Sequence, residues 1–93
     1  MSFLLKDPDS VLDYLVDWGV DYLGTDVLAD SDWTVAPAEP LGLEVVEHVF
    51  DQSFATVKAS GGLPGHIYRL TNRVTLESGR RDSRSVVIRV EAR

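Results

Sequence analysis

A regular alternation of apolar and polar residues marks the segment 66–76, HIYRLTNRVTL. Its apolar side chains share one parity, and its basic and hydroxyl side chains share the other: Tyr68, Leu70, Val74 and Leu76 against Arg69, Thr71, Arg73 and Thr75. Because successive side chains of a strand point to opposite faces, this pattern predicts a half-buried strand inside a sheet. Asn72 is the one polar residue among the apolar side chains of this strand. We expect a turn or bulge at this position, which would satisfy the hydrogen bonds of the Asn72 amide.

Turn signals stand on both sides of this strand. The segment 61–65, GGLPG, precedes it, and the segment 78–82, SGRRD, follows it. The second turn predicts a hairpin in which Gly79 takes a positive φ. Tyr68 stands just inside a strand that follows a tight turn, which is the position of the tyrosine corner in immunoglobulin-like sandwiches.

Further extended segments are predicted by their β-branched and aromatic content, by alternation and by turn residues. They cover residues 10–18, 25–35, 41–50, 54–61 and 83–93, with an irregularity expected near Val45 and Val46. Segment 10–18 also fits the spacing of a helix, and residues 19–24 fit a link with one helical turn. With 66–76, these segments predict an all-β fold, an immunoglobulin-like antiparallel β-sandwich of about seven strands, as one domain over residues 1–93. The predicted core is Leu12, Tyr14, Val16, Trp18, Trp33, Val57, Tyr68, Leu70, Val74, Val86, Ile88 and Val90.

The net charge of −6 is divided unequally along the 93 residues. Residues 1–51 carry twelve acidic side chains and one basic one, a net charge of −11, whereas residues 52–93 carry three acidic and eight basic ones, a net charge of +5. The overall sign argues against nucleic acid as a partner. There is no cysteine, which excludes disulfides and thiolate metal sites. The first residues contain an apolar run of only three, so we expect neither a signal peptide nor a membrane span.

The sequence predicts no enzymatic activity, no cofactor and no metal site. His48 and His66 belong to no metal-binding or catalytic spacing and are expected at the surface or at a strand edge. No GxSxG, GxGxxG or GxxxxGK motif is present. The eight aspartates of residues 7–32 leave calcium open as a ligand, although no DxDxDG loop occurs.

Candidate partner-binding residues come from the charge pattern. Asp30, Asp32, Arg69 and Arg73 are expected to lie together on an outer sheet face, and Arg80, Arg81 and Arg84 at the hairpin. Two interpretations stay open: opposite charges pair across strands, or the surface is electrostatically bipolar and docks on copies of itself or on another protein.

Several stretches resemble a family of small phage and prophage proteins. They are KDPDSVLDYLVDW (6–18), SDWTV (31–35) and SGGLPGHIYRLTNRVTLESGRRDSRSVVIRV (60–90), in this order, with the TNR segment as the most specific part. The resemblance covers nearly the whole chain and departs mainly in the middle, EPLGLEVVEHVFDQS. It implies a virion structural or virion-associated protein with an immunoglobulin-like fold and without catalytic residues.

From this resemblance we predict a non-enzymatic structural component of a bacteriophage or prophage particle. It would bind or decorate head or tail subunits, with phage capsid or tail proteins as partners and with self-association in many copies. It would be found in the virion, and in the host cytoplasm during assembly. The alternative is a stand-alone immunoglobulin-like module that binds a cell-surface carbohydrate or protein, for which Tyr22 and Phe50 are the candidate exposed aromatics.

Overall fold

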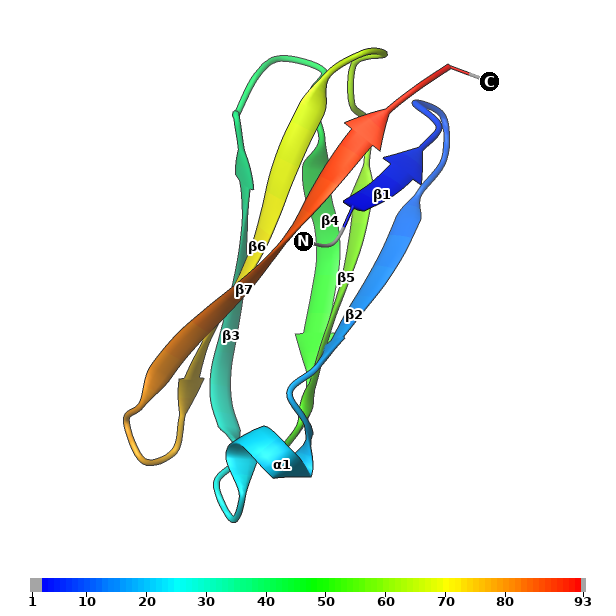
Figure 1. Ribbon diagram of the computed structural model, residues 1–93. Coiled ribbons are helices and arrows are strands. Elements are labelled where there is room, and N and C mark those ends of the chain that lie inside the picture. The colour runs from blue at the N-terminus through cyan, green and yellow to red at the C-terminus, as the bar shows by residue number, and fades with distance from the viewer. Residues whose placement is uncertain (1–2, 93) are drawn as a thin grey trace.

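Two β-sheets pack face to face in the computed structural model, which describes residues 3–92 and, at Phe3, Val20 and Asp21, the backbone alone (Figure 1). The first sheet has the order β1 (Phe3–Lys6), β7 (Arg81–Val90), β6 (Ile67–Leu76), β3 (Leu28–Ala36). The second has the order β2 (Leu12–Asp17), β5 (Phe54–Ser60), β4 (Glu44–Phe50). A short helix, α1 (Gly19–Leu23), connects β2 to β3 at one end of the sandwich. The predicted all-β sandwich of seven strands is confirmed.

Strand β6 lies inside its sheet, between β3 and β7, as its alternation predicts. It pairs antiparallel with both neighbours, so that Asn72 stands opposite Trp33 on one side and Arg84 on the other. The hairpin between β6 and β7 also forms as predicted. Gly79 has a φ of 92°, and the Leu76 N–H donates to the Arg80 carbonyl at 2.8 Å.

Strand β1 was not predicted, and among the strands of residues 3–92 it makes the one pairing that departs from the antiparallel expectation. It runs parallel to β7, with Leu4 opposite Ile88. A buried lysine anchors its end: the Lys6 Nζ donates to the carbonyls of Asp7, at 2.9 Å, and Gly61, at 2.8 Å. Burial lowers the pKa of the Lys6 ammonium. An apolar run of only three residues was too short to predict this strand from its pattern.

Irregularities in two strands shift which residues face the core. The register of β4 shifts between Val45 and Glu47, where the sequence predicts an irregularity. A second shift, between Leu28 and Asp30 in β3, was not predicted. It changes the parity of the strand, so that Ala29 is exposed, although simple alternation placed it with the buried Trp33.

The core lies between the sheets, and ten of the twelve predicted core residues are buried in it. Leu12 and Tyr14 are only partly buried, because β2 is an edge strand of its sheet. The core also includes residues outside the predicted set: Leu23, Leu28, Leu43, Ala55, Ala59 and Leu76.

The buried amide of Asn72 connects the two sheets. Its Oδ1 accepts a hydrogen bond from the Trp18 indole N–H at 3.0 Å, and its Nδ2 donates to Ser31 Oγ at 2.9 Å and to the Asp32 carbonyl at 3.1 Å. Asn72 itself lies within a regular part of β6, so the interpretation that a turn or bulge satisfies it is wrong. Side chains and backbone of other segments satisfy the amide instead, as burial requires.

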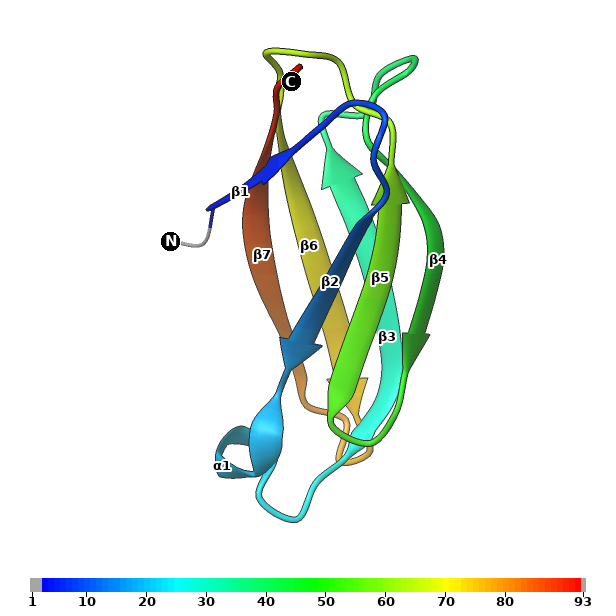
Figure 2. The same ribbon diagram turned by 90° about the vertical axis from the view of Figure 1, so that its right-hand side faces the viewer.

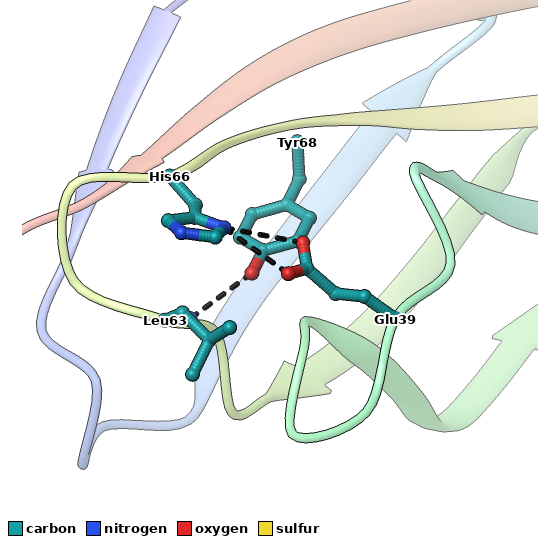
Figure 3. A network of polar contacts seen from close by, with 4 residues as sticks. All are labelled: Glu39, Leu63, His66 and Tyr68. Atoms are coloured by element: carbon teal, nitrogen blue, oxygen red, sulfur yellow. Dashed lines mark hydrogen bonds and ion pairs between the residues drawn. The ribbon is translucent and has the colours of Figure 1, made fainter.

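Tyr68 fixes the connection between β5 and β6. Its hydroxyl oxygen accepts a hydrogen bond from the Leu63 N–H at 3.0 Å, five residues upstream (Figure 3). Its ring is buried, and this burial raises the pKa of the phenol, with the Glu39 carboxylate acting in the same direction. The bond back to the preceding turn is that of a tyrosine corner, so this prediction is confirmed.

We predict that Asn72→Val destabilises the protein by about 1–3 kcal/mol, because it leaves the buried Trp18 N–H without an acceptor. Equilibrium urea unfolding measures the free energy. Thr75→Val, on the outer face of the same strand, is the matched control and should change it by less than about 0.5 kcal/mol. Trp18→Phe should cost less in the Asn72→Val background than in the wild type. If Trp18→Phe lowers the free energy of unfolding equally in both backgrounds, Trp18 and Asn72 are not energetically coupled.

We also predict that Tyr68→Phe costs about 1 kcal/mol, since it deprives the Leu63 N–H of its acceptor and keeps the ring. The change in unfolding midpoint in urea is the readout. Tyr14→Phe is the control, because the Tyr14 hydroxyl makes no hydrogen bond to any of the side chains or backbone groups that the structure describes. A loss no larger than that of the control would contradict the role of the Tyr68 hydroxyl.

Candidate interaction site

Five of the seven predicted site residues lie on the outer face of the sheet that contains β6. The register places Asp32 opposite Arg73, and it places Asp30 and Arg81 on the two sides of Thr75. Arg69 lies further along the same face, beside Ala36 of β3 and Val87 of β7. All five charged side chains are exposed. We call the outward side chains of β3, β6 and β7 the basic face, because arginines outnumber acidic side chains on it.

Cross-strand ion pairing, one of the two interpretations of these charges, is not what the structure shows on this face. Asp32 and Arg73 are in register but are not joined by an ion pair within 4.0 Å. The side chains that the structure describes form three such pairs: Lys58–Glu47 at 3.9 Å, His66–Glu39 at 3.1 Å and Arg89–Glu91 at 2.9 Å. Only the first of these joins neighbouring strands of a sheet.

The other two predicted arginines, Arg80 and Arg84, lie against the α1 end of the sandwich. The Arg84 guanidinium is 4.3 Å from the centre of the Trp18 ring, and its Nη1 donates to the Asp17 carbonyl at 3.1 Å. The Arg80 guanidinium is 5.0 Å from the centre of the Tyr22 ring. Such cation–π contacts are favourable. The three arginines lie in the hairpin, as expected, but they point in different directions: Arg81 points to the basic face, whereas Arg80 and Arg84 contact the aromatic rings at the α1 end.

A hydrogen bond between Tyr22 and Asp82 completes this contact between α1 and the hairpin. The Tyr22 hydroxyl donates to Asp82 Oδ2 at 2.7 Å. This bond lowers the pKa of the Asp82 carboxyl, with the Ser83 amide adding to the effect, and it raises the pKa of Tyr22. Tyr22 is thus half-buried in an internal contact, which leaves Phe50 as the exposed member of the two predicted ligand-binding aromatics.

The outer face of the opposite sheet has a different chemistry, and Figure 2 looks onto it. Its central row is Leu15 of β2, Thr56 of β5 and Val49 of β4; the exposed fractions are 50% for Leu15 and 61% for Val49. The next row is Asp13, Lys58 and Glu47, and the row on the other side begins with Asp17 and Phe54. A shallow hollow of about 380 Å³ lies over the first two rows. We call the outward side chains of β2, β5 and β4 the acidic face.

The histidines lie at the surface, as predicted. His48 is exposed on the edge strand β4. His66 is exposed at the start of β6, where its Nδ1 is 3.1 Å from a carboxylate oxygen of Glu39 (Figure 3). Across the side chains that the structure describes, no group of three or more His, Asp or Glu residues is arranged to hold a metal ion. Within residues 3–92, no helix is long and apolar enough to cross a membrane.

Residues 6–89 match the profile of a phage protein family described as podophage GP4 fiber-tail adaptor protein gp77. The chain belongs to this family. The match extends over nearly the whole sandwich, from the end of β1 to the end of β7, and it confirms the resemblance to a phage virion protein family. This gp77 family member is therefore a phage structural protein.

A likeness to a solved structure supports the fold. The solution structure of the PKD domain from KIAA 1837 protein superposes with a TM-score of 0.53 and 20% sequence identity, covering 98% of this chain and 79% of the other. The immunoglobulin-like class is therefore confirmed, and at this identity the likeness carries the fold alone. A search of curated protein sequences gives no match.

The acidic face of this gp77 family member was missed by the sequence interpretation. A signal for it exists: in β2 the parity opposite to the core holds Asp13, Leu15 and Asp17, and in β5 it holds Thr56 and Lys58. Recognising the face requires the order β2-β5-β4, because only this order brings Leu15 and Val49 to the two sides of Thr56.

We predict a pH-dependent loss of stability for Tyr22→Phe, measured by urea unfolding of both proteins from about pH 2 to 11. The lowered pKa of Asp82 means that the bond stabilises the fold above about pH 4 and that this contribution is lost as the pH falls through the folded-state pKa. The raised pKa of Tyr22 means that its contribution is complete below about pH 10 and is lost at higher pH. The difference between the proteins should therefore be largest near neutral pH. A difference independent of pH would contradict this.

Proposed function

We propose that this protein is an adaptor of a podophage tail, which joins a fibre to the tail without catalysing a reaction. The observation that carries the proposal is the match of residues 6–89 to the fiber-tail adaptor family. The sequence left head and tail open as locations, and the family description favours the tail. Its partners are then a tail protein and a fibre protein, and it is made in the host cytoplasm before it enters the virion.

The arrangement of the sandwich supports this proposal. An adaptor must bind two different partners at the same time, so it needs two separate surfaces with different chemistry. The acidic and basic faces lie on opposite sides of the packed sheets, and the core between them keeps them apart (Figure 2). Complementary charge on each partner would select the face to which it binds and orient the contact.

Deleting the gene from the source phage tests the proposal. We expect particles with assembled tails that lack fibres and do not adsorb, and we expect the chain itself in purified wild-type virions by mass spectrometry. Electron microscopy counts the fibres, and supplying the gene in trans should restore them. Mutant particles with a full set of fibres, or wild-type virions without the chain, would contradict the adaptor function.

A further inference from the structure

The acidic face combines an apolar centre with a charged surround. Leu15, Val49 and Phe54 are exposed there by 50%, 61% and 37%. Acidic side chains surround this apolar centre: Asp13, Asp17 and Glu47. Glu44, which stands opposite Ser60, lies on the same face. The single cation of this face, Lys58, already contacts Glu47. An apolar centre with a polar rim is the usual composition of a protein–protein contact surface.

The basic face has the opposite charge with a comparable mixture of groups. Four arginines point outward from β6 and β7: Arg69, Arg73, Arg81 and Arg89. The two acidic residues of this face, Asp30 and Asp32, lie at one edge, on β3. Apolar side chains lie at the end of this face away from the hairpin, where Ile67 stands opposite Arg89 and Leu5 of β1 stands on the other side of Arg89. Both Ile67 and Leu5 are about half exposed, at 55% and 46%.

From these two faces we propose that copies of this chain associate with one another, the acidic face of one copy packing on the basic face of the next. Two copies of the same face carry net charges of the same sign, which disfavours a symmetric dimer. Unlike faces attract through arginine and carboxylate side chains and bring apolar groups together. Since the two faces lie on opposite sides of the molecule, the contact is head to tail and generates a ring or a stack.

The size of the molecule permits such a contact. A typical stable interface removes about 800 Å² from each partner. The accessible surface of the chain is 5658 Å², so each contact would cover roughly one-seventh of it. The sandwich is elongated, with extents of 43 × 21 × 18 Å, and each of the two opposite faces runs along its length. In a head-to-tail stack the two end copies each keep one free face, acidic at one end and basic at the other, so these faces remain available to a tail protein and a fibre protein. The association itself requires no other phage protein and does not depend on the adaptor function.

Charge reversal on each face tests the proposal with the purified full chain. One variant carries D13K and D17K on the acidic face, and the other carries R69E and R73E on the basic face. A third variant, D9K with E77K, reverses exposed charges in loops off both faces and changes the net charge as much as the first one does. Thermal melting verifies that each is folded, and sedimentation velocity measures association over a range of protein concentrations.

We expect the wild type and the loop variant to associate at about 20 mM salt and to dissociate at about 500 mM. Each face variant alone should associate at least tenfold more weakly. An equimolar mixture of the two face variants should associate again, because each reversed face then meets a face of opposite charge. A monomeric wild type at low salt, or folded face variants whose mixture stays monomeric, would overturn the proposal and leave these faces to other proteins.

Discussion

The hydrogen bonds of one buried amide hold the two halves of this sandwich in register. Asn72 lies at the centre of β6, accepts from the Trp18 indole N–H and donates to Ser31 and to the backbone of Asp32. Trp18 follows β2 in one sheet, while Asn72 and Ser31 belong to the other. A buried amide is costly when unsatisfied and tolerated only where every partner is in place. Of its three hydrogen bonds, the one to Trp18 crosses between the sheets, and together they specify how the sheets meet more narrowly than apolar packing can.

Trp18 also connects this hydrogen-bond network to the end of the molecule at which α1 lies. Trp18 is buried, and the Arg84 guanidinium covers its ring and binds the Asp17 carbonyl where β2 ends. Tyr22 of α1 packs on Trp18, with ring centres 5.4 Å apart, and bonds to Asp82 of β7. A helix of five residues has little stability of its own. These side-chain contacts with β7 stabilise α1, which explains why two arginines of the hairpin region serve the fold.

Much of the fold was predictable because alternation reports directly which residues are buried. Strands β2, β5, β6 and β7 keep a constant parity, and nine of the ten correctly predicted core residues lie on them or, like Trp18, directly after them; the tenth, Trp33, is in β3. Prediction failed where the parity depends on contacts distant in sequence. The β3 bulge exposes Ala29, β1 exists because β7 offers an open edge, and the partners of Asn72 lie 54 and 41 residues away. Arg84 has the inward parity of β7 but is exposed, because its guanidinium lies over the ring of Trp18.

The candidate site was only half predictable for a related reason. The sequence separates an acidic half from a basic half, and it was open whether the two would interleave in the sheets. Strands of the two halves do lie side by side in both sheets, because β5 lies between β2 and β4, and β1 and β3 flank β7 and β6. These inserted strands add few opposite charges, however: β5 adds Lys58 to the acidic face, and β3 adds Asp30 and Asp32 to the basic face. Most of the linear charge division thus becomes a division between two opposite faces. The sequence pattern identified the arginines, and the strand order identifies the surface opposite to them.

The alternation of β6 determines which side of the molecule is basic. In a strand of period two, a slip of one residue moves every side chain to the other face. Such a slip of β6 would carry Asn72 to solvent and bring Arg69 and Arg73 into the core, at a cost that no pairing there could offset. An apolar residue in place of Asn72 would fit the core without requiring Trp18 and Ser31 at fixed positions. The apolar residues and the arginines of β6 thus keep the basic face outward, whereas the hydrogen bonds of Asn72 fix the positions of Trp18 and Ser31 on its inner side.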